Sequence, residues 1–207
     1  MHTLLMEALG TYYILVILSL TVNPIAIGLM IMAMTCVGAL VSGAHFNGAV
    51  SLAFMLHQKL SLHKALSYLG AQVAGALLAL WSFYMVTGLP YVPETIIDMP
   101  LVCAMGIEAK LTAVLCLVAL AVASSKMPGN TPAVRGFAIG LTFVSMAFVG
   151  GLFNPSIALA VMISSFIHNT GFVTIQNALI YVVAPFVGGA LASLIHSYFC
   201  KNLTKEW

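Results

Sequence analysis

The sequence predicts an all-α membrane protein made of two repeated halves, with six transmembrane helices and two shorter re-entrant helices. Three observations predict this fold class. The chain of 207 residues is 62% hydrophobic and only 6% charged, so a soluble fold could not bury its apolar surface. Apolar segments recur along the chain up to about residue 200. A short motif built around an asparagine occurs once in each half, which is typical of a central binding site or pore in an inverted repeat.

Six apolar segments are long enough to cross a bilayer, which requires about 20 residues. The expected spans are Leu4–Leu20, Pro24–Ser42, His63–Thr87, Pro100–Ser124, Thr131–Val149 and Asn177–Phe199. Two further apolar segments, Asn47–His57 and Asn154–His168, are too short to cross, so we expect them to be re-entrant or interfacial helices. Prolines and glycines separate the segments, for example at Asn23-Pro24.

The distribution of lysine and arginine predicts that both termini lie in the cytoplasm. With six spans, the basic residues on the side of the N-terminus are Lys59, Lys64, Lys126, Arg135, Lys201 and Lys205. The opposite loops carry Glu94 and Asp98, and Lys110 is the exception to the pattern. We therefore expect a multi-pass protein of the plasma membrane, surrounded by the lipid bilayer.

Composition also limits the classes of ligand. The formal net charge of +2 is too small to indicate binding to nucleic acid. The four cysteines lie far apart, in neither CxxC nor zinc-ligand spacing, and no histidine pair has acidic or thiol support for a metal. No constellation of residues suggests a catalytic nucleophile. We therefore expect no enzymatic activity, no metal and no other cofactor.

The repeat extends beyond the asparagine motif, and it divides a single domain, residues 1–207, into halves of about 1–98 and 99–207. The segment 26–29 matches the segment 138–141 at an offset of 112 residues, whereas Asn47 and Asn154 are 107 residues apart. The second half is therefore five residues shorter between these two points. Each half contains three spans and one short segment, and because three is odd, the halves have opposite topologies.

Each asparagine stands at the start of a short apolar helix. The two motifs read Gly43-Ala44-His45-Phe46-Asn47-Gly48-Ala49 and Gly150-Gly151-Leu152-Phe153-Asn154-Pro155-Ser156. An N-cap asparagine accepts hydrogen bonds from the first N–H groups of its helix, so we expect its amide N–H₂ group to face a central lumen. Two such donors and two positive helix ends would bind a neutral solute and repel cations and protons. A single asparagine would more simply be an ordinary cap, but its repetition in register favours a pore.

These motifs resemble the two Asn-Pro-Ala boxes of the aquaporin and aquaglyceroporin (major intrinsic protein) family. Further matches are Glu7-Ala8-Leu9-Gly10-Thr11, Ala71-Gln72 with Gly75, Glu108, and Ala184-Pro185 with Gly188. The resemblance implies a homotetramer with one pore per protomer, and a passive channel for water or small uncharged solutes such as glycerol or urea. It implies that Asn47 and Asn154 bind the permeant, and that four residues shape the two helix starts, namely Gly48, Ala49, Pro155 and Ser156.

Three departures from the family pattern affect the expected selectivity. Gly48 replaces the usual proline, and Ser156 replaces the usual alanine. The outer constriction of the family normally has an arginine three residues after the second asparagine, where this chain has Ile157. The remaining constriction positions correspond to Ile27, Gly151 and either Thr142 or Ala147, because the deletion leaves the alignment of the fifth span open. None is charged, which predicts an apolar mouth and weak discrimination against larger neutral solutes.

Three titratable residues lie near the expected pore. Glu7 and Glu108 occupy matching repeat positions within predicted spans, so each should face the protein interior. The family resemblance implies that they accept backbone N–H groups of the re-entrant loops, and a proton relay is the alternative. His45 precedes the first asparagine by two residues, and a hydrogen bond to the permeant and a packing role are equally compatible with that position.

Two other functions remain open on the sequence. A proton-coupled secondary transporter is also built from inverted repeats, and it would require Glu7 or Glu108 in the permeation path. A non-conducting structural or junctional membrane protein could keep the same fold.

Overall fold

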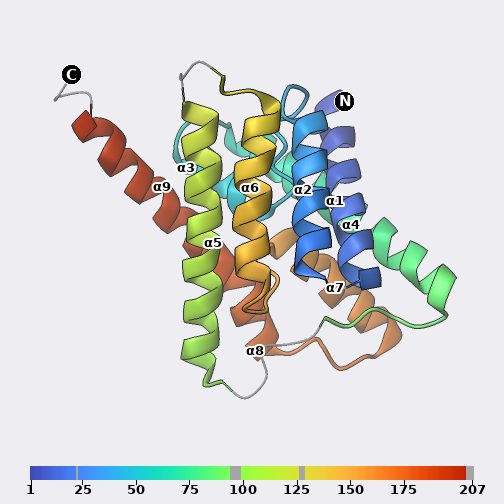
Figure 1. Ribbon diagram of the computed structural model, residues 1–207. Helices are drawn as coiled ribbons and strands as arrows, with labels where there is room; N and C mark the ends of the chain where they lie inside the picture. Colours follow the sequence, from blue (N-terminus) through green and yellow to red (C-terminus); the bar gives the residue numbers. More distant parts are fainter. Residues whose placement is uncertain (22, 94–98, 126–128, 204–207) are drawn as a thin grey trace.

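The computed structural model describes residues 1–21, 23–93, 99–125 and 129–203, with side chains up to Cys200, and every regular element among them is helical (Figure 1). The elements are α1 (His2–Thr21), α2 (Pro24–Gly38), α3 (Gly48–Leu56), α4 (Leu62–Thr87), α5 (Leu101–Ser124), α6 (Pro132–Ala147), α7 (Pro155–His168), α8 (Ile175–Ala178), the π-helix η1 (Leu179–Val183) and α9 (Ala184–Leu203). The all-α prediction is confirmed, and the two expected short helices are α3 and α7.

The helices differ in length more than the sequence predicts. In the described part of the chain, α1, α4, α5 and the continuous helix 175–200 are long and apolar enough to cross a membrane. The second and fifth expected spans, α2 and α6, have only 15 and 16 residues, and they end at Gly38 and Ala147. At about 1.5 Å per residue such helices are shorter than a hydrocarbon core of about 30 Å. The approximate predicted ends at Ser42 and Val149 lie four and two residues beyond the observed ones, because turns follow each helix and lead to α3 and α7.

The last span contains a widened turn whose cause is visible in the sequence. The N–H of Ala184 bonds to the carbonyl of Leu179, five residues earlier, at the end of η1. Pro185 follows, and a proline inside a helix has no N–H and clashes with the carbonyl four residues before it. A single π turn relieves this clash and lets the helix continue.

The packing of the helices follows the repeat. α1 packs mainly on α4, α5 packs on α9 in the same way, and α2 and α6 pack against each other between the halves. At the contact of α2 and α6, a Cβ on Gly28 would lie 2.7 Å from the carbonyl oxygen of Gly140, and one on Gly140 would lie 2.6 Å from that of Gly28. The two glycines are equivalent in the sequence repeat, so the backbones meet about its symmetry axis.

Glycines also permit close crossings within each half. A Cβ added to Gly75 would lie 2.1 Å from the carbonyl oxygen of Ala8, and one added to Gly188 would lie 2.3 Å from that of Ala109. These crossings of α1 with α4 and of α5 with α9 are related by the repeat. Small residues at such positions are typical of closely packed membrane helices.

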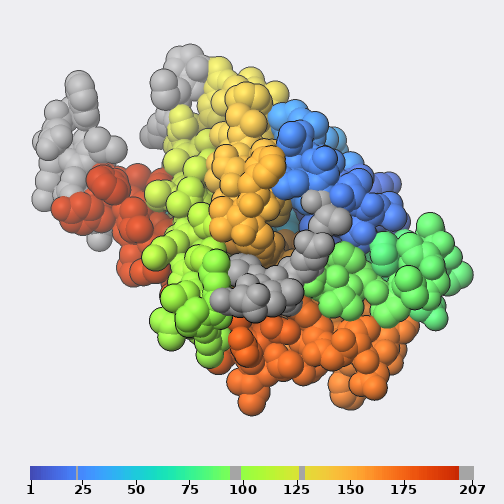
Figure 2. Space-filling view, turned by 60° about the horizontal axis from the view of Figure 1, so that its bottom comes forward, coloured from blue at the N-terminus to red at the C-terminus, as the bar shows by residue number. Residues whose placement is uncertain are grey.

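The N-terminus and the end of α9 lie on the same side of the bundle. Figure 1 shows the N-terminus, the end of α5, the beginning of α6 and the end of α9 at one end. At the other end, α4 and α7 lie side by side, as Figure 2 shows from below. The predicted orientation depends partly on the charges of Glu94, Asp98, Lys126 and Lys205, which lie outside the described residues.

Candidate functional site

The two asparagines of the repeated motif are the N-caps of α3 and α7. The side-chain oxygen of Asn47 accepts the N–H of Ala49 at 2.8 Å, and that of Asn154 accepts the N–H of Ser156 at 3.1 Å. Both caps have extended backbone, and Pro155 occupies the first position of α7, where its missing N–H has no cost. The two helices therefore begin from equivalent asparagines deep inside the molecule, where both residues are buried.

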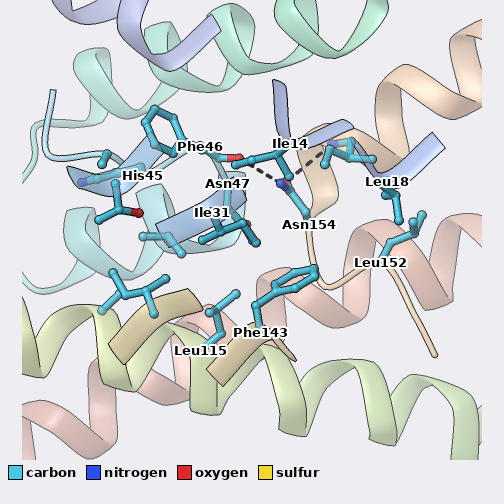
Figure 3. Close-up of a pocket in the computed structure, with 16 residues that line it drawn as sticks. Ile14, Leu18, Ile31, His45, Phe46, Asn47, Leu115, Phe143, Leu152 and Asn154 are labelled. Carbon is cyan, nitrogen blue, oxygen red and sulfur yellow. Dashed lines mark hydrogen bonds between the residues drawn. The ribbon is translucent and has the colours of Figure 1, made fainter. Parts of the chain in front are cut away.

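Each asparagine also bonds to the opposite half of the repeat. Nδ2 of Asn47 donates to the carbonyl oxygen of Phe153 at 2.8 Å. Nδ2 of Asn154 donates to the carbonyl oxygen of Phe46 at 2.9 Å, a bond drawn in Figure 3. An amide N–H₂ group has two hydrogens, so one N–H per asparagine remains for a ligand. The expectation that the whole group faces a lumen is thus corrected to one N–H from each side.

The acceptor carbonyls belong to residues with unusual backbone conformation. Phe46 has φ 49° and Phe153 has φ 50°, in the left-handed region that non-glycine residues rarely occupy. Each of these residues directly precedes a capping asparagine, and both are almost fully buried. The same strained turn thus occurs in both halves, and the cross-bonds to Asn47 and Asn154 help to hold it.

Glu7 and Glu108 support these two turns. Glu7 accepts the N–H groups of His45 at 3.0 Å and Phe46 at 2.7 Å, and both of its oxygens are used. Glu108 accepts the equivalent N–H groups, those of Leu152 at 2.8 Å and Phe153 at 2.9 Å. Both carboxylates are fully buried. Their geometry is that of anchors for the segments before α3 and α7, as the family resemblance implies.

The residues that depart from the usual boxes contact one another. A Cβ on Gly48 would lie 2.9 Å from Oγ of Ser156 and 3.2 Å from Cγ of Pro155, so the two helix starts abut. The Ser156 hydroxyl donates to Oε1 of Gln72 at 2.7 Å, and Nε2 of Gln72 donates to Glu7 at 2.8 Å. Gly48, which has no side chain, thus leaves room at the start of α3 for the hydroxyl of Ser156 at the start of α7. Gln72 links the start of α7 to the buried carboxylate, and its Nε2 also donates to the Ser51 hydroxyl of α3 at 3.2 Å.

Three cavities that share lining residues surround this centre. The outer cavity is lined by Leu18, Pro24, Ile27, Tyr91, Pro93, Phe143, Ala147, Gly150, Gly151 and Leu152. The central cavity, drawn in Figure 3, contains both asparagines together with Ile31, Thr35, His45, Phe143, Leu152 and Ile157 among its lining residues. The inner cavity is lined by Thr35, Ala39, Gly43, Ala44, His45, Val50, Phe54, Ala119, Val122, Ala123, Arg135 and Ile139. Because neighbouring cavities share residues, they form a series through the molecule.

The outer cavity distinguishes the two candidates on the fifth span. Ala147 lines it together with Ile27 and Gly151, whereas Thr142 is not among its lining residues. The hydroxyl of Thr142 donates instead to the carbonyl of Ala138, one turn earlier in α6, at 2.8 Å. Ile157 lies one step further in and lines the central cavity. The alignment of the two repeats along α6, which gives Ala147, therefore identifies the residue at the cavity. Counting back from Asn154, which gives Thr142, does not.

Phe143 lines both the outer and the central cavity and is not among the site residues predicted from the sequence. Its ring is 7% exposed and lies edge-on to that of Phe153, with 6.3 Å between the ring centroids. The signal that could have revealed it is helical spacing, because Phe143 and Ala147 are four residues apart and share one face of α6.

His45 combines the two roles that the sequence left open. It lines the central and inner cavities. Its Nδ1 lies 3.1 Å from the hydroxyl of Ser51, and its ring packs 4.5 Å from that of Phe54. The imidazole is therefore both a wall of the cavity and part of the packing between α3 and the segment that precedes it.

Comparisons with known proteins agree with this architecture. The profile of the family described as major intrinsic protein matches residues 4–196. The chain is 30% identical to glycerol uptake facilitator protein-like 6 of Lactiplantibacillus plantarum, over 98% of both chains. It is 29% identical to the lens fiber major intrinsic protein of Lithobates pipiens, over 86% of this chain and 68% of that protein. The X-ray structure of the aquaglyceroporin from Plasmodium falciparum superimposes with a TM-score of 0.83 at 21% identity, covering 100% of this chain and 99% of the other, and shares its fold.

Proposed function

Because the chain belongs to the major intrinsic protein family, a family of integral multi-pass membrane proteins, we propose that it is a passive channel for water and small uncharged solutes. The observation that carries this proposal is the pair of asparagine caps beside the central cavity. Each cap has one amide N–H left to donate to a permeant oxygen. The helix N-termini of α3 and α7 add positive potential at the same place, which disfavours cations and protons.

The lining of the outer cavity supports the proposal that solutes larger than water also permeate. Among the described residues that line it, none carries a charge, and Ile27, Ala147 and Gly151 present apolar or small groups. Ile157 continues this apolar surface into the central cavity. An apolar constriction offers contacts to the carbon backbone of a polyol and no charged barrier. Glycerol is the first candidate, since a relative of nearly equal length bears the name of a glycerol uptake facilitator.

The geometry of the carboxylates favours a channel over a proton-coupled transporter. Both oxygens of Glu7 and both of Glu108 accept backbone N–H groups, and neither residue is among those lining the three cavities. A coupling carboxylate would need access to the permeation path. Uptake that depends on a proton gradient and is abolished by Glu108→Gln would instead support the transporter.

The proposed assembly is a homotetramer in the plasma membrane, with one pore per protomer and both termini in the cytoplasm. Lys59, Lys64 and Arg135 support this orientation, because basic residues concentrate on cytoplasmic loops. Mass measurement of the protein in detergent tests the oligomeric state. Labelling of single cysteines placed at either terminus, in intact and in opened cells, tests the orientation.

Stopped-flow light scattering on proteoliposomes tests the proposed function. We expect flux of water and glycerol above that of protein-free liposomes, with no dependence on a proton gradient. Urea provides a second uncharged solute of similar size. Flux of neither water nor glycerol through well-folded protein would overturn the proposal and favour a non-conducting structural role for this fold.

A further inference from the structure

Thr35, on α2, carries a buried hydroxyl that has no hydrogen-bond partner among the described residues. The residue is 2% exposed. Threonines in helices commonly donate to the carbonyl one turn earlier, as Thr11 does to Glu7 and Thr142 to Ala138, each at 2.8 Å. A buried polar group without any partner is unfavourable and uncommon, so the state of this hydroxyl requires an explanation.

The position of Thr35 supplies one. Among the described residues, it is one of six that line both the central and the inner cavity, and the others are Ala44, His45, Val50, Ala119 and Ile139. Four of the six side chains are purely apolar. His45 already shares its Nδ1 with the Ser51 hydroxyl at 3.1 Å. The Thr35 hydroxyl therefore lies where the two cavities meet, and among the six shared residues only Thr35 and His45 have polar side chains.

We infer that the Thr35 hydroxyl is a permeant-binding site between the asparagine pair and the inner cavity, an inference that rests on the proposed channel function. The amides of Asn47 and Asn154 offer only N–H donors to the central cavity, because their oxygens cap α3 and α7. A hydroxyl both donates and accepts. A solute with its own O–H or N–H groups can thus accept a bond from an asparagine and donate one to Thr35.

This arrangement defines a class of permeant. Water, polyols and urea-like molecules carry donors as well as acceptors, and they satisfy both sites. A solute that only accepts hydrogen bonds can receive one from an asparagine and one from the Thr35 O–H, but it cannot use the Thr35 oxygen as an acceptor. The site therefore offers hydroxylated or amide solutes one more hydrogen bond than a solute that only accepts, at the inner side of the asparagines.

The chain provides a matched control for the test. Thr112, on α5, is also fully buried, and its hydroxyl likewise has no partner among the described residues. Thr112 is not among the lining residues of the three cavities. Thr112→Val and Thr35→Val thus remove the same chemical group from buried helix positions, and only Thr35→Val removes it from the proposed path.

The experiment compares glycerol and water flux in proteoliposomes for the wild type, Thr35→Val, Thr35→Ser and Thr112→Val. Loss of one hydrogen bond in the passage lowers glycerol flux by about three- to tenfold in Thr35→Val. Thr35→Ser keeps the hydroxyl and should conduct like the wild type, as should Thr112→Val. Valine has the shape of threonine, so Thr35→Val should still elute as a single species in size-exclusion chromatography. If it does not, Thr35→Ala removes the same hydroxyl and provides the same test.

The outcomes separate this inference from the proposed function. A conducting wild type in which Thr35→Val passes glycerol as fast as Thr112→Val overturns the role of Thr35 and leaves the channel intact. A wild type that passes neither water nor glycerol overturns both. Equal loss of flux in Thr35→Val and Thr112→Val would assign the effect to helix packing and would also overturn the inference.

Discussion

Nδ2 of Asn47 donates a hydrogen bond of 2.8 Å to the carbonyl oxygen of Phe153, and so joins the first half of the repeat to the second. Asn154 makes the equivalent bond to Phe46. Each asparagine thereby caps its own helix, stabilises the strained turn of the other half and retains one N–H beside the central cavity. The asparagine pair connects the two halves of the repeat and is also the proposed binding site, so we expect mutations there to affect both stability and transport.

Asn47→Asp tests the hydrogen bond between Asn47 and the Phe153 carbonyl. The new carboxylate can still cap α3, but its second oxygen would face the Phe153 carbonyl, so two buried acceptors would lack a donor. We expect the free energy of unfolding to fall by about 1–3 kcal/mol or more. Thermal denaturation in detergent measures this loss.

Asn23→Asp is the matched control, because Asn23 caps α2 through bonds to Ile25 and Ala26 at an exposed site. Aspartate caps helices as well as asparagine does and complements the positive helix end. We expect a change within about 0.5 kcal/mol. Equal stability of the two variants would contradict the cross-bond of Asn47.

Phe143→Ala should widen the passage between the outer and central cavities. We expect the permeability ratio of glycerol to water to rise, because the ring lines both cavities. The loss of stability should be smaller than the about 3–5 kcal/mol of a fully packed phenylalanine, since one side of the ring already borders open space. Phe137→Ala removes an exposed ring from the same helix and should leave the ratio unchanged. A ratio that stays constant in both variants would exclude Phe143 from the constriction.

Ile157→Arg should introduce the charged constriction that the family usually has. An apolar site distinguishes two solutes that differ by one methylene by about 1–3 kcal/mol. Replacing Ile157 by arginine changes the width of the path by more than one methylene. We therefore expect the glycerol-to-water ratio to fall at least about fivefold, as measured by light scattering. Ile157→Met controls for the loss of the native side chain at nearly constant volume. Unchanged selectivity in the arginine variant would contradict the assignment of Ile157 to the path.

Gly75→Ala should destabilise the crossing of α1 and α4. Its Cβ would lie 2.1 Å from the carbonyl oxygen of Ala8, so the helices must separate, at a typical cost of about 1–3 kcal/mol. Gly70→Ala in the same helix meets nothing within 4 Å. That control should gain about 0.5–1 kcal/mol from the better helix propensity of alanine. Thermal denaturation of the two proteins should shift in opposite directions, and a stable Gly75→Ala variant would refute the close crossing.

Much of the fold was predictable because local patterns in this chain repeat. Apolar length identified the long helices, and the recurrence of Asn47 as Asn154 identified the two short ones. The ends of α2 and α6 were predicted too far along the chain. Apolar residues continue past Gly38 and Ala147, and hydropathy alone does not reveal where a helix gives way to a turn.

Residues whose roles depend on contacts between distant segments were harder to predict from the sequence. The choice between Thr142 and Ala147 required the position of α6 relative to the outer cavity. Phe143 and Thr35 had no motif to identify them, since a phenylalanine or a threonine in an apolar helix is ordinary. Gln72 could be noticed only as part of a family match, and its bonds to Ser156 and Glu7 span 84 and 65 residues of sequence.

Local sequence patterns are enough to identify a helical membrane protein with an internal repeat, because lipid requires long apolar segments and each asparagine caps a helix through its immediate neighbours. The carbonyl to which each asparagine amide donates, and the side chains that border the cavities, depend on how the helices pack in three dimensions. These contacts join residues more than 100 positions apart, as Asn47 joins Phe153. The close approach of α2 and α6 at Gly28 and Gly140 likewise joins segments 112 residues apart in the sequence.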